Sequence, residues 1–297
     1  MFWFLSDKIN NALKSIDVDS LFEIRIRNGL PIKVLVKNKW GYLSASGFSI
    51  CTSKAIIADD NEAQLVAVRA SENSLYSVFD NVAKGFLTLK DGTRIGLCGE
   101  CVRMDGKIKT FKNFSSVTVR IPHEITNASN NFFNYIIQSE NVKNTLIVSP
   151  PGGGKTTVLR DIGRKLSFSH NVLIVDERYE LAGICNGKPF FNVGECDVIS
   201  GCNKSVALEN ALRSCAPDVI ITDEICEDDY FSIRQAISGG VKIITSIHSD
   251  SVENLFKKPN FEKFLSNKIF DLFIVLQGRN NPGKCVSAYN ENITRIY

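Results

Sequence analysis

Three consecutive glycines followed by a lysine and two threonines are the first residues in this chain whose types and spacing could do chemistry. They lie in LIVSPPGGGKTTVLRDIGRKL, residues 146–166. Glycines let backbone N–H groups surround an anion closely, while the lysine of such a P-loop binds phosphate oxygens and the next hydroxyl binds Mg²⁺. We therefore expect the loop to hold the phosphates of ATP together with Mg²⁺. The expected contacts are Ser149, Pro150, Pro151, Gly152, Gly153, Gly154, Lys155, Thr156 and Thr157, with Thr156 also a metal ligand.

One position departs from the P-loop pattern, because Ser149 stands where the first glycine is usual. That residue only ends the preceding strand, so the anion-binding geometry should survive the change. The plain alternative is a Gly- and Pro-rich connection between a strand and a helix. An apolar run before the loop and helical periodicity after it favour the phosphate site.

Two further apolar runs end in carboxylates that could serve hydrolysis. DVIITDE ends in Asp223 and Glu224, of which the first would hold Mg²⁺ and the second would polarise the attacking water. NVLIVDERYE supplies Asp176, Glu177 and Glu180, and which of these carboxylates acts is open. An exposed acidic cluster is the alternative for the first run. Ligands of α/β sheets, however, bind at the carboxyl ends of parallel strands, which favours a site.

The elements that must position these residues alternate from about residue 128 onwards. Strand-like runs alternate with helical ones as far as VKIITSIHSD, whose strand ends with His248, one of three histidines in the chain. Taken alone, His248 would be read as a structural histidine. The alternation predicts βαβ units on a mostly parallel sheet, and residues 270–290 predict a closing hairpin across an Asn-Pro-Gly loop. The fold class is therefore α/β, with a core domain over residues 128–297.

Residues 1–127 predict a smaller α/β domain built around a sheet. Residues 20–43 alternate apolar and polar side chains and predict two strands joined by a Gly-Leu-Pro turn, and residues 53–70 could form a helix. Between residues 70 and 125, the pattern predicts an amphipathic helix, a hairpin and a strand. The residues that carry these predictions are Leu75, Val78, Phe79 and Val82 with the helix end at Gly85, Asp91 and Gly92 in the hairpin, and Pro122 after the strand.

Composition argues against several classes of protein. The formal charge of +3, from 35 basic and 32 acidic residues, gives no reason to expect a nucleic-acid surface. The apolar runs are too short for direct membrane insertion. Nine cysteines without a secretory signal suit a reducing, cytoplasmic compartment. Cys98 and Cys101 in CGEC have a metal-like spacing, but no second pair accompanies them, which favours ordinary thiols on a turn over a metal or redox site.

The order of the four strand ends resembles the secretion ATPases that drive type II and type IV secretion and pilus assembly. ALRSCAPDVIITDEI is similar to the Walker B region of that family, and QAISGGVKIITSIHSD is similar to its His box. The resemblance implies a RecA-like P-loop ATPase core in which His248 monitors the γ-phosphate. IVDERYE differs from the usual Asp box, with Arg178 where a proline is common, and this leaves its acting carboxylate open.

Over most of its length the chain resembles a sporulation branch of this family from endospore-forming bacteria. The resemblance implies an ATPase that powers a channel-like complex between mother cell and forespore. It further implies a self-assembled ring, expected to be a hexamer, that docks on membrane-embedded components from the cytoplasmic side. The segments that carry it are EIRIRNGLPI, SLYSVFDNVAKGFLTLKDGTRIGLCGECV, SPPGGGKTTVLRDI, VDERYELAG and LRSCAPDVIITDE.

The same family resemblance implies arginines that reach the nucleotide of a neighbouring subunit. Arg94 in DGTRIGLCG and Arg120 in SVTVRIP match positions where secretion ATPases carry such arginines. Arg25 and Arg27 are weaker alternatives. Solvated strand residues are the plain alternative for all of them, since arginines are common on exposed strands.

Two other functions are left open by the sequence. A RecA-like nucleic-acid motor would use the same core, but the near-neutral charge and the lack of a basic stripe count against it. A nucleotide-dependent scaffold with little turnover would also bind ATP, although Glu224 would then have no evident use.

Overall fold

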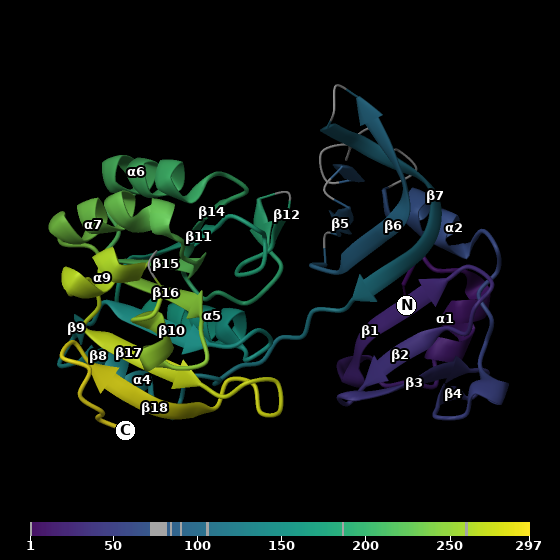
Figure 1. The fold of residues 1–297 in the computed structure, drawn as a ribbon, viewed down its shortest axis with the longest axis horizontal. Coiled ribbons are helices and arrows are strands. Elements are labelled where there is room, and N and C mark those ends of the chain that lie inside the picture. Colours follow the sequence, from purple (N-terminus) through teal and green to yellow (C-terminus); the bar gives the residue numbers. More distant parts are fainter. Residues whose placement is uncertain are drawn as a thin grey trace. The chain divides into compact units, whose positions relative to one another are not determined.

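The fold of the chain is given by a computed structural model. The described chain divides into two compact units, Met1–His123 and Glu124–Tyr297 (Figure 1). The residues that the structure describes are 2–71, 82–83, 85–89, 91–104, 107–185, 187–258 and 261–297.

The first unit is built on an antiparallel sheet, whose strand order within the described residues is β4-β3-β2-β1-β7-β6-β5. Helix α2 packs against β1, β6 and β7. The helices and strands of this unit are α1 (Asp7–Leu13), β1 (Leu21–Arg27), β2 (Lys33–Val36), β3 (Lys39–Ser44), β4 (Gly47–Ser49), α2 (Glu62–Ala70), β5 (Phe86–Thr88), β6 (Arg94–Met104) and β7 (Lys107–Arg120).

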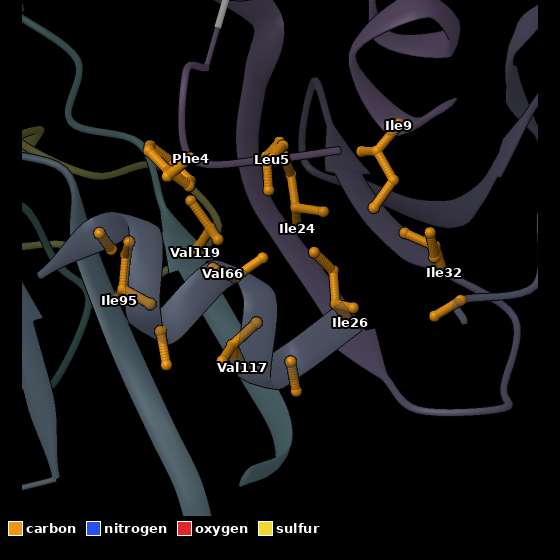
Figure 2. Close-up of a cluster of buried hydrophobic side chains, with 14 of the residues drawn as sticks. Phe4, Leu5, Ile9, Ile24, Ile26, Ile32, Val66, Ile95, Val117 and Val119 are labelled. Carbon is orange, nitrogen blue, oxygen red and sulfur yellow. The ribbon is translucent and has the colours of Figure 1, made fainter. Parts of the chain in front are cut away.

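The core of the first unit lies between this sheet and its helices. Figure 2 shows Val66 of α2 among Ile95, Val117 and Val119 of β6 and β7, and all four side chains are fully buried or nearly so. On each strand every second residue points to the same face, so the alternating sequence supplies one apolar face for α2 to cover.

The structure corrects the prediction of two strands over residues 20–43, because three strands form there. The Gly-Leu-Pro turn joins β1 to β2 as expected, but a second hairpin follows at Lys37 and Asn38, which have φ of 46° and 62°. Two consecutive residues in the left-handed region are typical of the tight type I′ turn between two strands. A lysine is an uncommon residue for such a turn, so the sequence carried little sign of it.

The other predictions for the first unit have mixed outcomes. The hairpin at Asp91 and Gly92 is confirmed, since β5 pairs antiparallel with β6 across it, and β7 ends before Pro122. The helix possible over residues 53–70 begins only at Glu62, and Thr52–Lys54 is a short 3-10 turn. The amphipathic helix predicted from Leu75 to Val82 lies largely in residues 72–81, outside the described residues.

The second unit is an α/β sheet with strand order β14-β11-β15-β16-β10-β17-β18 within the described residues. The expected βαβ units are confirmed: neighbouring strands are parallel except β18, which pairs antiparallel with β17 as the predicted closing hairpin. The larger elements are β10 (Thr145–Ser149), α5 (Lys155–Leu166), β11 (Val172–Asp176), β14 (Asp197–Ser200), α6 (Lys204–Ser214), β15 (Val219–Glu224), α7 (Tyr230–Ser238), β16 (Lys242–His248), β17 (Leu272–Leu276) and β18 (Cys285–Asn290). The shorter ones are α4 (Phe133–Ile136), β8 (Ile137–Gln138), β9 (Asn141–Val142), β12 (Ile184–Cys185), β13 (Lys188–Pro189), α8 (Val252–Leu255) and α9 (Glu262–Ser266).

Helices cover both faces of this sheet, which explains why its strands read as unbroken apolar runs. Leu146 and Val148 of β10 pack in one buried cluster with residues of α6 and α7. Ile147, between them, packs in the other cluster with residues of α5. Because the strand ends are held from both faces, the side chains that follow each strand have fixed positions. No helix in the described part of the chain is long and apolar enough to span a membrane.

Candidate nucleotide site

The glycine-rich loop connects the end of β10 to the start of α5 with a backbone that requires glycine. Gly152 and Gly154 have φ of 77° and 88°, in the left-handed region that favours glycine. A Cβ placed on Gly153 would collide with Oγ of Ser149. The loop therefore packs closely against the end of β10, and α5 begins at Lys155 with its free N–H groups and the positive end of its dipole directed at the loop.

Three of the predicted site residues meet where three neighbouring strands end. Strands β15, β16 and β10 are adjacent and parallel, so their carboxyl ends lie at one edge of the sheet. Nζ of Lys155 lies 2.7 Å from Nδ1 of His248. Nε2 of His248 lies 3.3 Å from Oε2 of Glu224, and the backbone N–H of His248 donates to Oε1 of Glu224 at 3.3 Å. Lysine, histidine and carboxylate thus form one connected row.

Lys155 is a buried cation in this row. Burial lowers the pKa of its ammonium group, and the nearby charges of Glu224 and Glu180 oppose that shift. A buried ammonium beside glycine N–H groups and a helix N-terminus is well suited to an anion of high charge. The arrangement can therefore hold a polyphosphate next to a carboxylate able to orient water.

Asp223 has the surroundings expected of a metal ligand. Its Oδ1 lies 3.2 Å from Nζ of Lys204, whereas its Oδ2 is buried and has no hydrogen-bond partner among the described residues. Burial raises the pKa of this carboxyl, and Lys204 opposes that shift. A buried carboxylate oxygen without a partner is costly unless a cation or donor completes it. The donor set of Asp223 with the half-buried Thr156 hydroxyl fits Mg²⁺, which prefers oxygen ligands.

Lys204 is a site residue that the sequence analysis missed. It is 3% exposed at the first position of α6, and its Nζ contacts Asp229 Oδ2 at 3.1 Å as well as Asp223. It also donates to the backbone carbonyl of Glu224. The buried ammonium therefore ties the start of α6 to the end of β15, and it holds Oδ1 of Asp223 while Oδ2 has no hydrogen-bond partner among the described residues.

Asp176, one of the three carboxylates that the sequence left open, is fully occupied by backbone groups. Its Oδ1 accepts from the N–H groups of Glu180 and Leu181 at 2.8 and 3.0 Å. Its Oδ2 accepts from Ala182 and Gly183 at 2.9 and 3.0 Å. A carboxylate with four such bonds at 0% exposure is suited to fixing a loop rather than to taking a proton from water.

The loop that Asp176 fixes also carries the other two carboxylates. Arg160 of α5 is buried and donates to the carbonyls of Leu181 and Glu180 at 2.7 and 2.9 Å, while its guanidinium stacks on Phe191. Glu180 is half-buried and its charge acts on Lys155, whereas Glu177 is exposed. Of the two, Glu180 is held near the phosphate loop.

Arg94 and Arg120 lie side by side in the first unit. They are direct partners in the pairing of β6 with β7, and Arg120 is also the partner of Glu23 in the pairing of β7 with β1. The Arg94 guanidinium lies 4.2 Å from the centre of the Phe86 ring, and Nε of Arg120 lies 3.9 Å from Oε2 of Glu23. Residues directly opposite each other share a face of the sheet, so the two arginines form one basic pair.

Cys98 and Cys101 are exposed free thiols within strand β6, not on a turn as expected. The described residues contain no group of three or more His, Cys, Asp or Glu side chains placed to bind a metal ion.

Two solved structures share the fold of this chain. The pilus retraction motor PilT with bound ADP superposes with a TM-score of 0.56 at 15% identity, over 91% of this chain and 78% of that chain. The ATPase DotB of Legionella pneumophila gives a TM-score of 0.56 at 15% identity, over 89% of this chain and 74% of that chain. The expected RecA-like core preceded by a smaller α/β domain is thereby confirmed as the fold.

Comparison of the sequence identifies the family. Stage III sporulation protein AA of Bacillus subtilis (strain 168) is 31% identical over 299 residues, which cover 97% of this chain and 94% of that protein. Residues 2–296 match the family described as sporulation stage III, protein AA. With nearly every residue inside that match, the chain belongs to the stage III sporulation protein AA family.

Proposed function

We propose that this chain is a Mg-ATP hydrolysing motor that energises a secretion-like channel complex between mother cell and forespore during sporulation. The observation that carries the proposal is the row of Lys155, His248 and Glu224 beside a glycine loop at the carboxyl ends of adjacent parallel strands. Membership of the sporulation family supports the setting, and the fold of the secretion ATPases supports the chemistry.

Each residue of the site has a distinct task in this proposal. Lys155 binds the β- and γ-phosphate oxygens, and the N–H groups of the glycine loop surround the phosphates. Bound Mg²⁺, held by Thr156 and Asp223, would neutralise charge on these oxygens. Glu224 orients and polarises the attacking water, and His248 contacts the γ-phosphate end while it remains hydrogen-bonded to Glu224.

The assembly that we propose is a ring of identical subunits, expected to be a hexamer. It docks from the cytoplasmic side on membrane-embedded components of the channel, through protein contacts rather than membrane insertion. The basic pair of Arg94 and Arg120 would then complete the site of a neighbouring subunit. A mass measurement with and without Mg-ATP tests the ring, because a chain that stays monomeric in both conditions contradicts this part of the proposal.

The central test is Mg²⁺-dependent ATP binding and hydrolysis by the full chain and by Lys155→Ala. The variant loses the only lysine of the phosphate loop, so we expect tight Mg-ATP binding to be abolished. Lys188→Ala removes an equal charge from an exposed position on β13 and should bind as the parent does. If Lys155→Ala bound and hydrolysed ATP like the parent, the assignment of the loop would be wrong.

A further inference from the structure

The turn between β17 and β18 packs along the outer side of the phosphate loop. The backbone N–H of Gly283 donates to the carbonyl of Gly153 at 2.8 Å. A Cβ on Gly154 would lie 2.7 Å from the Gly283 nitrogen, and a Cβ on Gly153 would lie 2.8 Å from the carbonyl oxygen of Gln277. The glycines thus serve two purposes, since they admit an anion on one side and this turn on the other.

Arg279 is the cationic side chain that this turn lays against the loop. A Cβ on Gly152 would lie 2.8 Å from Cγ and 3.0 Å from Nε of Arg279. The aliphatic stem therefore rests on the glycine, and the guanidinium group, which is bonded to that Nε, lies beside the loop. Arg279 is exposed, so its guanidinium borders solvent where an anion would enter.

The sheet order determines which end of a triphosphate Arg279 can meet. Strands β15 and β16, which carry Glu224 and His248, lie on one side of β10, whereas β17 lies on the other side (Figure 1). The γ-phosphate must sit beside Glu224 for water to attack it. The remaining phosphates then extend from the loop toward the β17 side, where Arg279 lies.

We propose that Arg279 binds the α- or β-phosphate of a nucleotide held in the same subunit. The proposal rests on the proposed function. It adds a phosphate-binding residue that lies outside the P-loop sequence pattern. A guanidinium offers a planar fork of N–H donors that matches two phosphate oxygens. Because ADP and ATP share the α- and β-phosphates, Arg279 contributes to the affinity for both and is distinct from an arginine that acts on the γ-phosphate in the transition state.

The test is isothermal titration calorimetry of the full chain with ADP and with the non-hydrolysable analogue AMP-PNP. Arg279→Ala should weaken both by the same factor, about tenfold, as expected for loss of a hydrogen bond to a charged group. Arg279→Lys keeps the charge without the fork and should recover part of the affinity. Lys284→Ala is the matched control, because it removes an equal charge from an exposed position in the same turn.

The outcomes separate this proposal from the one on which it rests. Parent protein that binds neither ADP nor AMP-PNP overturns the proposed function and this inference with it. Parent protein that binds ADP while Arg279→Ala binds it equally well overturns the inference alone. A loss confined to AMP-PNP also overturns it, because Arg279 would then act on the γ-phosphate. Unchanged thermal unfolding of Arg279→Ala without nucleotide shows that a lost affinity does not reflect a lost fold.

Discussion

Nζ of Lys155 lies 2.7 Å from Nδ1 of His248, so the lysine of the phosphate loop is held by the residue that ends the neighbouring strand. An ammonium can only donate, so Nδ1 accepts and Nε2 is left to donate to Glu224, 3.3 Å away. A bound triphosphate and His248 would share the three N–H donors of Lys155. The row therefore couples occupation of the loop to the position of β16 and of the carboxylate beside it.

The first prediction separates binding from chemistry at the end of β15. Glu224→Gln keeps the size of the side chain but removes its ability to polarise water, so nucleotide should still bind while turnover falls by about 10²-fold or more. Asp223→Asn should instead weaken the dependence of binding on Mg²⁺. Steady-state ATP hydrolysis and titration calorimetry with and without Mg²⁺ measure the two effects.

The control for this prediction is Glu227→Gln, an equal change at an exposed position shortly after Glu224. It should leave turnover unchanged. If Glu224→Gln were as active as the parent, the catalytic carboxylate would have to be sought in the loop of Glu177 and Glu180.

The second prediction concerns Lys204, whose ammonium is buried between Asp223 and Asp229. Lys204→Met keeps a long unbranched side chain but leaves both carboxylates without their cation. Breaking a buried charge network from one side should lower the free energy of unfolding by about 3 kcal/mol. Urea unfolding followed by circular dichroism measures the change.

A matched variant is available at the surface. Lys263 forms an exposed pair with Glu227 at 3.7 Å, so Lys263→Met should cost less than about 1 kcal/mol. If Lys204→Met cost no more than Lys263→Met, the buried contacts of Lys204 would not stabilise the fold.

The contrast between the phosphate loop and Lys204 shows what the sequence could predict of the site. The residues from Gly152 to Thr156 are consecutive in the sequence, so the phosphate loop can be recognised from one segment. Lys204 and Arg279 approach the site from other elements, and a lysine that opens a helix or an arginine in a turn is usually solvated. Only the three-dimensional packing distinguishes these two cations from the other basic residues.

The fold, like the site, has parts that the sequence predicts and parts that it does not. The βαβ alternation of the second unit was predictable because buried parallel strands and amphipathic helices have distinct periods. In the first unit, the strand break at Lys37 and Asn38 lacked the usual glycine. Asn61 is of a type favoured before a helix, but the sequence prediction did not use it to start α2 at Glu62, and its side chain makes no cap bond. Asp176 ended its strand as predicted, but its use as an acceptor for four N–H groups depends on how the following loop turns back.

The third prediction concerns the pH dependence of stability at Asp161 of α5. Its side chain accepts from the N–H groups of Asn127 and Ser129 at 2.8 and 2.9 Å and from the Ser129 hydroxyl at 2.6 Å. Burial would raise the pKa of this carboxyl, but the bonds from Ser129 and the Lys165 ammonium outweigh it and hold the pKa below its ordinary value of 3.8. Asp161→Asn should therefore lower the free energy of unfolding at pH 7 by about 2 kcal/mol.

The sign of the pH effect follows from the lowered pKa. The stability that the charged carboxylate contributes is fully present above the unfolded value of 3.8 and is lost as the pH falls through the lower folded value. The difference between parent and Asp161→Asn should thus be constant from pH 7 to about pH 5 and narrow below about pH 4. Urea unfolding at a series of pH values checks this, and a difference that widened in acid would contradict it.

The last prediction asks where a positive charge beyond Lys155 comes from during phosphoryl transfer, since such enzymes commonly use an arginine supplied in cis or in trans. Arg94 and Arg120 are direct cross-strand partners, so they can act as one pair on a neighbouring subunit. If they do, ATP turnover per subunit should rise with protein concentration as the ring assembles. The double variant Arg94→Ala, Arg120→Ala should bind nucleotide but turn it over slowly, whereas Arg103→Ala, on the same sheet, should behave as the parent.

Mixing distinguishes action in trans from a structural role. The double arginine variant has an intact loop, and Lys155→Ala has intact arginines, so a mixed ring contains interfaces at which an intact loop meets an intact pair. Each protein alone should hydrolyse ATP far more slowly than the parent, so the rate should recover in part in the mixture. Absence of recovery in mixtures shown by mass to have co-assembled would exclude arginines in trans. The candidates that then remain are Arg178 and Arg213 of the second unit. Of these, the charge of Arg178 already acts on Asp223, whereas Arg213 lies in the last turn of α6 and pairs with Glu209.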